Sequence, residues 1–156
     1  MKYTFKMTAL DRKVLAELQH NCRLSNQDIA ERVGSSASSV WRRIRTMEEA
    51  GVIGGFHVAV TAEALGYAEI IMVHVCLSKH SDKGIDAFTQ LVDNAPEVLE
   101  CYAVTGDHDF LLKVLAKDMR AFYRFLEETL MNKDYIDRTS STVVMNKIKE
   151  SRSVPV

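Results

Sequence analysis

The sequence predicts an α+β fold, in which a helix-turn-helix (winged-helix-like) domain is followed by a ferredoxin-like βαββαβ domain. Residues 8–51 carry apolar side chains at helical spacing in three short segments, whereas residues 69–145 contain β-branched runs separated by two helical stretches. The charge also divides: residues 1–60 hold nine Lys/Arg against six Asp/Glu, +3, and residues 61–156 hold eleven against fifteen, −4. A chain of 156 residues with 47% apolar and 26% charged residues is expected to be globular, with one large or two small domains.

The first predicted helix begins near Thr8. Its apolar residues follow at i, i+4, i+5 and i+8, which is one face of a helix: Leu10, Val14, Leu15 and Leu18. A single short helix of this kind cannot bury its apolar face alone. We therefore expect it to complete a small core with the two helices that follow.

The second helix is predicted to begin at Ser25, because Asp28 stands three residues later in an acidic version of the capping box. Three apolar residues form its buried face: Ile29, Ala30 and Val33. Gly34 is expected to end it, since a helix commonly stops at a left-handed glycine. The tight turn Gly34-Ser35 then predicts a helix-turn-helix.

The third helix is predicted to begin among Ser36 to Ser38 and to end at Gly51. Val40, Ile44 and Met47 lie on one face at i, i+4 and i+7. At about 100° per residue, Ser38, Arg42 and Arg45 lie opposite that face. The exposed side of this helix is therefore expected to be basic and hydroxylic.

Such a surface suits duplex DNA, because arginine can donate two hydrogen bonds to guanine O6 and N7 while serine and basic side chains hold phosphates. The predicted DNA-binding residues are Ser36, Ser38, Ser39, Arg42, Arg43 and Arg45. The alternative is an ordinary solvated helix face on an αα corner that does not bind DNA. Trp41 lies about 100° from the apolar face, and core packing is favoured for it over contact with a thymine methyl group.

The second half opens with a β-branched run at residues 69–77, which predicts a strand buried on at least one face. A helix is predicted over residues 84–94, ended by Asn94-Ala95-Pro96. Its expected buried residues are Ile85, Phe88, Leu91 and Val92. Residues 98–104 and 110–116 then predict two strands joined by a turn at residues 106–109.

A last helix is predicted from Asp118 to about Leu130. Its expected inward residues are Met119, Phe122, Tyr123, Leu126 and Leu130. A final strand is predicted from about Arg138 to Met145, which completes the order βαββαβ. The expected division is a DNA-binding domain over residues 1–53, a linker over 54–66 and the βαββαβ domain over 67–156.

Composition excludes several classes of protein. The three cysteines, at positions 22, 76 and 101, are odd in number and lack the CxxC spacing of a zinc site, so neither a disulfide framework nor a structural zinc site is expected. The N-terminus lacks the apolar region of a signal peptide, and no run approaches the ~18 apolar residues of a membrane helix. These features predict a cytoplasmic protein without a membrane partner, and the predicted DNA-binding helix adds the expectation that it is nucleoid-associated.

Several segments carry a resemblance to a known family. The run LDRKVLAELQHNCRLSNQDIAERVGSSASSVWRRIRTMEEAGVI and the hairpin CYAVTGDHDFLLKV resemble the Lrp/AsnC family of transcriptional regulators over nearly the whole chain. The most specific element is Thr105-Gly106-Asp107-His108-Asp109-Phe110-Leu111-Leu112, set behind the helix-turn-helix. The run from Thr139 to Lys149 and the closing Ser153-Val154-Pro155 are also similar to family members.

The resemblance implies that the βαββαβ domain binds an effector and forms oligomers, with amino acids held where hairpin loops of neighbouring dimers meet. The matching positions are Tyr102, Val104, Thr105, Gly106, Asp107 and Asp109, with Thr139, Ser140 and Ser141 as second partners. The implied partners are double-stranded DNA with inverted half-sites, further copies of the chain in a dimer, tetramer or octamer, and a small amino-acid ligand. No cofactor or metal is implied.

The residue types fit this ligand. A free amino acid needs a carboxylate for its ammonium group and backbone N–H groups or hydroxyls for its own carboxylate. Asp107 or Asp109 can supply the first, and Gly106 with Thr105 the second. The competing interpretation is that Gly-Asp-His-Asp is simply a good hairpin turn.

One departure from the family concerns the start of the third helix. Family members often carry prolines and a cysteine there, whereas this chain has Ala37, Ser38, Ser39 and Val40. The fold is expected to tolerate this difference. The base preferences of other members are therefore not transferred to this chain.

Other functional classes find less support. His108 lies between two aspartates, but no serine-histidine-acid pattern, HExxH or phosphate-binding loop accompanies it, so no enzyme is predicted. A metal- or thiol-responsive regulator using Cys101, Cys76 or His108 is the alternative within the regulator class. A free-standing amino-acid-binding module is a third alternative, and it would leave the arginines of the third helix without a role.

Overall fold

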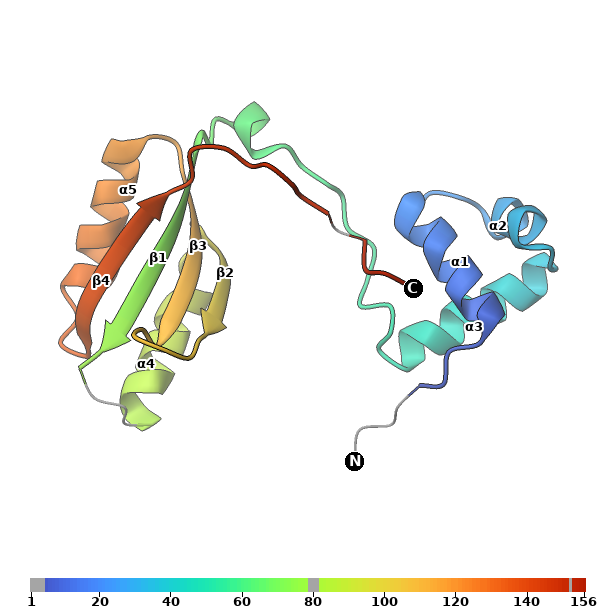
Figure 1. Ribbon diagram of the computed structural model, residues 1–156, viewed down its shortest axis with the longest axis horizontal. Helices are drawn as coiled ribbons and strands as arrows, with labels where there is room; N and C mark the ends of the chain where they lie inside the picture. Colours follow the sequence, from blue (N-terminus) through green and yellow to red (C-terminus); the bar gives the residue numbers. More distant parts are fainter. Residues whose placement is uncertain (1–4, 79–81, 152) are drawn as a thin grey trace. The chain divides into compact units, whose positions relative to one another are not determined.

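The computed structural model describes residues 5–78, 82–151 and 153–156. The chain divides into two compact units, Met1–Ala59 with Lys149–Val156, and Val60–Ile148 (Figure 1). The predicted boundaries, 1–53, 54–66 and 67–156, differ from this grouping in two respects, of which the first is that the predicted linker is divided between the units at Ala59 and Val60. The last eight residues group with the N-terminal unit, although they follow the βαββαβ segment in sequence.

The N-terminal unit contains three helices, α1 (Ala9–His20), α2 (Asn26–Val33) and α3 (Ala37–Glu49). Their apolar faces meet in one core of six buried residues: Val14, Leu18, Ile29, Ala30, Val40 and Met47. Val52 and Ile53 pack against this core after α3 ends. The predicted helix-turn-helix is confirmed.

The helix ends follow from local chemistry. Ser25 caps α2 through the predicted capping box with Asp28, and Gly34 ends it with φ 70°, in the left-handed region that favours glycine. A second capping box, between Thr8 and Asp11, begins α1. The predicted helix start near Thr8 is confirmed, and the capping box gives it a physical cause.

Trp41 departs from the prediction. Its side chain is 59% exposed on α3, so the preference for core packing is wrong in this chain. The apolar face of α3 is narrow, and a residue about 100° away from its centre lies beyond the contact with α1 and α2. Trp41 instead adds an exposed aromatic ring to the surface of α3.

The second unit contains the predicted βαββαβ order: β1 (Glu69–Leu77), α4 (Asp82–Asp93), β2 (Val98–Ala103), β3 (Phe110–Ala116), α5 (Met119–Phe125) and β4 (Ile136–Val143). A π-helix, Leu126–Met131, continues α5, and a short 3₁₀ helix, Ala62–Leu65, precedes β1. The strands form one antiparallel sheet in the order β2-β3-β1-β4 (Figure 1). This is the ferredoxin-like arrangement that the sequence predicts.

Alternation along the strands separates the two faces of the sheet. Ile71, Val73 and Val75 of β1 are fully buried and pack in one core with Phe88 of α4 and Phe122 of α5. Met72, His74 and Cys76 have the opposite orientation and are half-buried. One face of the sheet therefore lies under α4 and α5, and no helix formed by the described residues of this unit covers the other face.

The predicted inward set of α5 needs correction. Met119 and Tyr123 are 47% and 56% exposed, and Phe125, which was not predicted, is buried. Asp118 caps the helix and fixes where it begins. Phe122 and Phe125, at i and i+3, lie on one side of the helix and are its buried residues. The wider turn of the following π-helix keeps Leu130 in the core.

The other differences are small. Ile85, expected to be buried on α4, is 37% exposed, while Phe88 is fully buried. The strand β2 ends one residue earlier than predicted, and β4 begins two residues earlier. No helix in the described part of the chain is both long and apolar enough to span a bilayer.

Candidate DNA-binding face and effector loop

The start of α3 presents a hydroxyl-rich surface. The Ser36 hydroxyl accepts a hydrogen bond from the Ser39 amide at 3.3 Å and lies 3.2 Å from the Ser38 hydroxyl. Ser36 and Ser38 are exposed, while Ser39 is half-buried. Ser39 donates its backbone amide to the cap and is the least exposed of the three, so Ser36 and Ser38 are the more accessible serines of this set.

Two of the three predicted arginines extend from the same side of α3. Arg42 and Arg45 are exposed, and the Arg45 Nε lies 3.1 Å from the Glu49 carboxylate one turn later. An exposed i,i+4 pair of this kind contributes only about 0.3–0.5 kcal/mol, so it does not compete strongly with a phosphate or a base. These two guanidinium groups are available to a duplex.

Arg43 has a different environment. Its Nη1 lies 3.0 Å from Asp11 Oδ1 and 3.3 Å from Oδ2, and donates to the Thr8 hydroxyl at 3.2 Å. Its Nε is buried and has no hydrogen-bond partner among the described residues. The structure therefore directs Arg43 toward α1, and its predicted contact with DNA stays a prediction.

Asp11 is held as a carboxylate by these contacts. Burial raises its pKa, but the hydrogen bonds from Thr8 and the nearby Arg43 guanidinium outweigh burial, so the pKa of Asp11 lies below its usual value. Asp11 is not among the residues predicted to be functional. The signal was present as an aspartate three residues after Thr8, the spacing of a capping box.

The loop between β2 and β3 contains most of the predicted effector residues. The Val104 amide donates to the Asp109 carbonyl at 2.9 Å, which closes the loop, and the Asp109 amide donates to the Val75 carbonyl at 3.0 Å. The Asp109 carboxylate accepts a hydrogen bond from the Leu77 amide at 2.7 Å. Asp109 therefore fastens the loop to the end of β1, where the pairing with β4 shifts register.

Gly106 and Asp107 form the exposed tip of this loop. Gly106 has φ 110°, a conformation that a side chain strains, and no atom lies within 4 Å of the position that its Cβ would take. Asp107 is exposed, and its carbonyl accepts from the Cys76 thiol at 3.3 Å. The tip therefore presents an open backbone and a carboxylate side chain.

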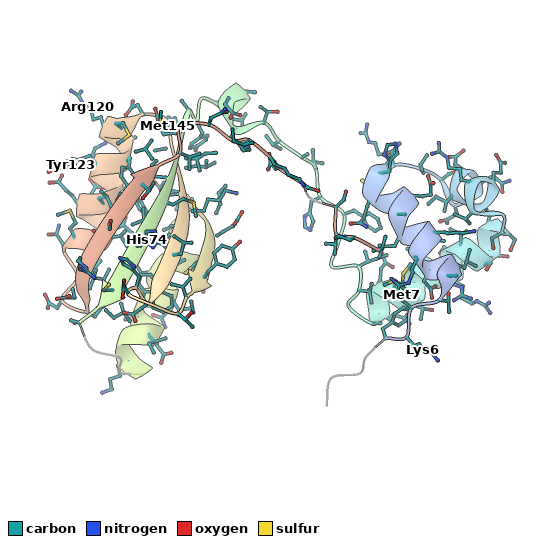
Figure 2. All side chains as sticks on the ribbon, in the orientation of Figure 1. Lys6, Met7, His74, Arg120, Tyr123 and Met145 are labelled. Carbon is teal, nitrogen blue, oxygen red and sulfur yellow. The ribbon has the colours of Figure 1, made fainter. Side chains whose placement is uncertain are left out.

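Three residues outside the predicted effector set adjoin the loop, and they are His74, Cys76 and Arg138. The His74 ring on β1 lies 4.6 Å from the His108 ring, and Figure 2 shows His74 on the sheet. Arg138 on β4 donates from Nη2 to Cys76 Sγ at 3.6 Å. Contact with Cys76 and the carboxylates of Asp137 and Asp107 raises the pKa of Arg138. The order of strands alone does not predict that Arg138 meets Cys76. That contact depends on the register of β1 with β4.

The remaining predicted effector residues lie on the two outer strands. Tyr102, Leu111, His74 and Ser140 form one row across the sheet, so about 14 Å separates the first Cα from the last. Thr139 and Ser141 pair with Val75 and Val73 and have the orientation of the helix-covered face. A single chain therefore does not bring Tyr102 and Thr139–Ser141 around one small ligand.

The Tyr102 hydroxyl is engaged on the open face. It donates to Glu100 at 2.6 Å, and Lys113 Nζ lies 2.8 Å from the other oxygen of that carboxylate. The Lys113 and Tyr102 hydrogen bonds lower the pKa of Glu100, and the same contact with Glu100 raises the pKa of Tyr102. Tyr102 is thus ordered by residues of its own hairpin.

The alternative interpretation, a metal- or thiol-responsive regulator that uses Cys101, Cys76 or His108, receives little support from the structure. Among the described residues, no group of three or more His, Cys, Asp and Glu side chains is arranged to hold a metal ion. Burial and Asp93 raise the pKa of the Cys101 thiol, which disfavours the reactive thiolate.

A cavity of about 420 Å³ lies at the other end of β3. Its lining includes Tyr67, Lys117, Arg124, Phe125 and Glu128. None of the predicted effector residues lines this cavity. The cavity is therefore separate from the loop between β2 and β3.

Comparison with known proteins gives a consistent result over the whole chain. Residues 70–154 match the model of the Lrp/AsnC ligand binding domain, and residues 7–53 match a winged helix-turn-helix DNA-binding model. The leucine-responsive regulatory protein of Rhizobium meliloti is 36% identical over 151 residues, covering 97% of each chain. The transcriptional regulator AzlB of Bacillus subtilis is 32% identical, covering 94% of this chain and 93% of that protein.

Two solved structures are similar in fold. The L-methionine complex of a transcriptional regulator from Neisseria meningitidis has a TM-score of 0.91 and 31% identity, covering 96% of this chain and 97% of that one. An AsnC family transcriptional regulator from Agrobacterium tumefaciens has a TM-score of 0.90 and 34% identity with the same coverage. The relatives are transcriptional regulators and not enzymes.

Proposed function

Because the chain belongs to the Lrp/AsnC family of transcriptional regulators, we propose that it binds specific DNA through α3 and responds to a free amino acid bound at the β2–β3 loop. The observation that carries the proposal is the pairing, in one chain, of an exposed Ser/Arg helix face with a loop tip that offers an exposed carboxylate and open backbone. No cofactor is needed for either activity. A DNA partner also implies a cytoplasmic, nucleoid-associated location.

The DNA-binding part of the proposal assigns different roles to the predicted residues. Arg42 and Arg45 read base edges or hold phosphates, and Ser36 and Ser38 contact phosphates near the start of α3. Ser39 contributes through its backbone at the cap. The basic face and the +3 charge of residues 1–60 both favour approach to a polyanion.

The effector part of the proposal distinguishes the two aspartates. Asp107 is exposed at the loop tip and is placed to receive an ammonium group, whereas the Asp109 carboxylate accepts from Leu77. Backbone N–H groups of Thr105 and Gly106 suit the ligand carboxylate. The L-methionine complex of the Neisseria meningitidis regulator supports an amino acid as the ligand class.

The assembly part of the proposal concerns the face of the sheet that carries no helix of its own unit. We propose that a second copy of the chain covers this face, where half-buried apolar residues lie: Ile70, Met72, Leu111 and Leu115. The predicted effector residues also call for a second copy. Tyr102 and Ser140 lie at opposite ends of one row across the sheet, so one chain does not surround a small ligand with both. The resulting dimers would associate further into tetramers or octamers at the hairpin loops.

A ligand screen tests the function directly. The purified full-length chain is heated with each standard amino acid in turn, and unfolding is followed. A ligand at 100 times its dissociation constant stabilises a protein by about 2.7 kcal/mol. We expect one or a few amino acids to raise the melting temperature and to change the affinity for an operator selected from genomic DNA. A chain that responds to none of them would contradict the amino-acid proposal while leaving DNA binding intact.

A further inference from the structure

Asp11 is the one buried charged residue among the described positions, with 1% of its surface exposed. It lies on α1, outside the helix-turn-helix pair itself. Its carboxylate accepts from the Thr8 amide at 2.8 Å and from the Thr8 hydroxyl at 2.6 Å. The remaining partner is Arg43, which comes from α3.

Arg43 is occupied or enclosed at two of its three nitrogens. Nη1 is engaged by Asp11 and Thr8, and Nε is buried with no partner in the described part of the chain. Bidentate recognition of a guanine or a phosphate needs two adjacent N–H groups in one plane. Both possible pairs, Nη1 with Nη2 and Nε with Nη2, include a nitrogen that is not available at the surface.

We infer that Asp11 is a positioning residue for the recognition helix, which fixes α3 against α1 and withholds the Arg43 guanidinium from DNA. The inference rests on the proposed recognition face. The cations of α3 that reach a duplex are then Arg42 and Arg45. Arg43 lies between them in sequence and would otherwise add a third phosphate contact of no sequence specificity.

The consequence is measurable because phosphate contacts release counterions. Each phosphate neutralised on duplex DNA adds about 0.9 to the steepness of log K against log salt concentration. The Arg43 side chain is 32% exposed, so its guanidinium group can turn to solvent once Asp11 is removed. Loss of Asp11 is thus expected to add one phosphate contact, while a simple loss of folded protein would leave the slope unchanged.

The experiment uses the full-length chain and a duplex of about two helical turns, ~20 bp, with no operator sequence. Binding is measured by fluorescence anisotropy over a salt series for the parent, Asp11→Ala and Asp28→Ala. Asp28 is the matched control, because it makes the same capping box with Ser25 but contacts no arginine of α3. We expect the slope to steepen by about 0.9 per head in Asp11→Ala and to stay at the parent value in Asp28→Ala.

Variants of Arg43 complete the test. We expect Arg43→Gln to leave the parent slope unchanged, and Asp11→Ala with Arg43→Gln to return to it. A slope that falls by about 0.9 in Arg43→Gln would overturn the inference, as would a folded Asp11→Ala with the parent slope. If Asp11→Ala does not fold, Asp11→Asn against Asp28→Asn makes the same comparison, because asparagine keeps an acceptor oxygen for Thr8.

One further arm separates this inference from the proposed function. Arg42→Ala is expected to flatten the slope by about 0.9. If Arg42→Ala has no effect while Asp11→Ala still steepens the slope, the assignment of Arg42 to the recognition face is wrong, whereas the retention of Arg43 by Asp11 is supported. If both changes behave as expected, the recognition face and the role of Asp11 are supported together.

Discussion

At the scale of single residues, neighbouring side chains of the same type have different environments. Arg42 and Arg43 are adjacent, yet one is exposed and the other is tied to a buried carboxylate. Asp107 and Asp109 lie in one loop, yet the Asp109 carboxylate accepts a hydrogen bond from a strand. Residue type alone therefore does not assign function in either region, and paired substitutions are the appropriate test.

Replacing Arg42 or Arg45 by alanine is expected to weaken binding to a specific operator by about 1–3 kcal/mol and to relax preference at one base pair. Neither change should lower thermal stability appreciably, since both side chains are exposed. Glu49→Ala is the matched control, because it removes the same ion pair as Arg45→Ala without removing a positive charge. Parent-like operator affinity in both arginine variants would show that the recognition face is misassigned.

Asp107→Ala is expected to abolish the response to the amino acid while leaving ligand-free DNA affinity nearly unchanged, because an effector acts only through its differential affinity for two states. Asp109→Ala is expected to destabilise the protein by about 1–3 kcal/mol, since it leaves the Leu77 amide without its acceptor. Calorimetric titration and thermal unfolding separate the two outcomes. A preserved ligand response in Asp107→Ala would favour a purely structural hairpin turn.

The capping aspartates predict an acid limit for the N-terminal unit. The pKa values of Asp11 and Asp28 both lie below their usual range, in Asp28 because Ser25 donates to its carboxylate. Their stabilising contribution is therefore complete above a pH of about 4 and is lost as the pH falls through the folded-state values. Trp41, the single tryptophan, lies in this unit, so urea unfolding followed by its fluorescence measures the effect. Asp11→Asn should flatten the pH dependence below pH about 4.

At the scale of elements, glycine and the caps decide where helices stop. Gly34 separates α2 from α3 with φ 70°, and nothing lies within 4 Å of a Cβ built there. The two helices thus meet at an angle set by backbone conformation and not by a close contact at the turn. In the second unit, the π-helix Leu126–Met131 after α5 has a comparable influence, since it sets which residues that follow α5 face the sheet.

Gly34→Ala is expected to destabilise the N-terminal unit by about 1–2 kcal/mol, the cost of a side chain in the left-handed region. Gly54→Ala is the control, because that glycine has no close neighbours at its Cβ position and a φ outside the left-handed region. Unfolding followed by Trp41 fluorescence compares the two. Equal stability of both variants would indicate that the turn relaxes without cost.

At the scale of the whole molecule, the two units carry separate parts of the function. The proposed DNA-binding face lies on α3 in one unit, and the loop proposed to bind the effector lies in the βαββαβ unit. Linkage between them requires that ligand binding change an equilibrium of the assembly. Tyr102 and Ser140 lie on opposite outer strands of the sheet, which is why the proposed ligand site includes residues of a second chain.

A dimer with two such heads is expected to prefer inverted half-sites. Their centres should lie about one helical turn apart, ~10 bp, or a multiple of it, because both recognition helices must enter the same side of the duplex. Footprinting on selected binding sites measures this spacing. A single asymmetric half-site that suffices for full affinity would contradict the dimeric model.

The sequence by itself determined the order of elements and most of their ends. Helical and alternating periodicity, Ser25 with Asp28, and Gly34 are local signals, and local signals act within a few residues. They predicted the helix-turn-helix, the βαββαβ order and the turn at residues 106–109. Periodicity did not decide Trp41, Met119 or Tyr123, because burial at the edge of an apolar face depends on how far the neighbouring element reaches.

Only the tertiary structure decided which side chains meet across elements. The pairing of Asp11 with Arg43 joins residues 32 apart, and the contact of Cys76 with Arg138 joins residues 62 apart. Such contacts follow from the packing of α1 against α3 and from the register of β1 with β4, which no short segment encodes. For the same reason the sequence grouped Arg43 with Arg42 and Arg45, and Tyr102 with Ser140, whereas the fold ties Arg43 to Asp11 and places Tyr102 and Ser140 on the two outer strands.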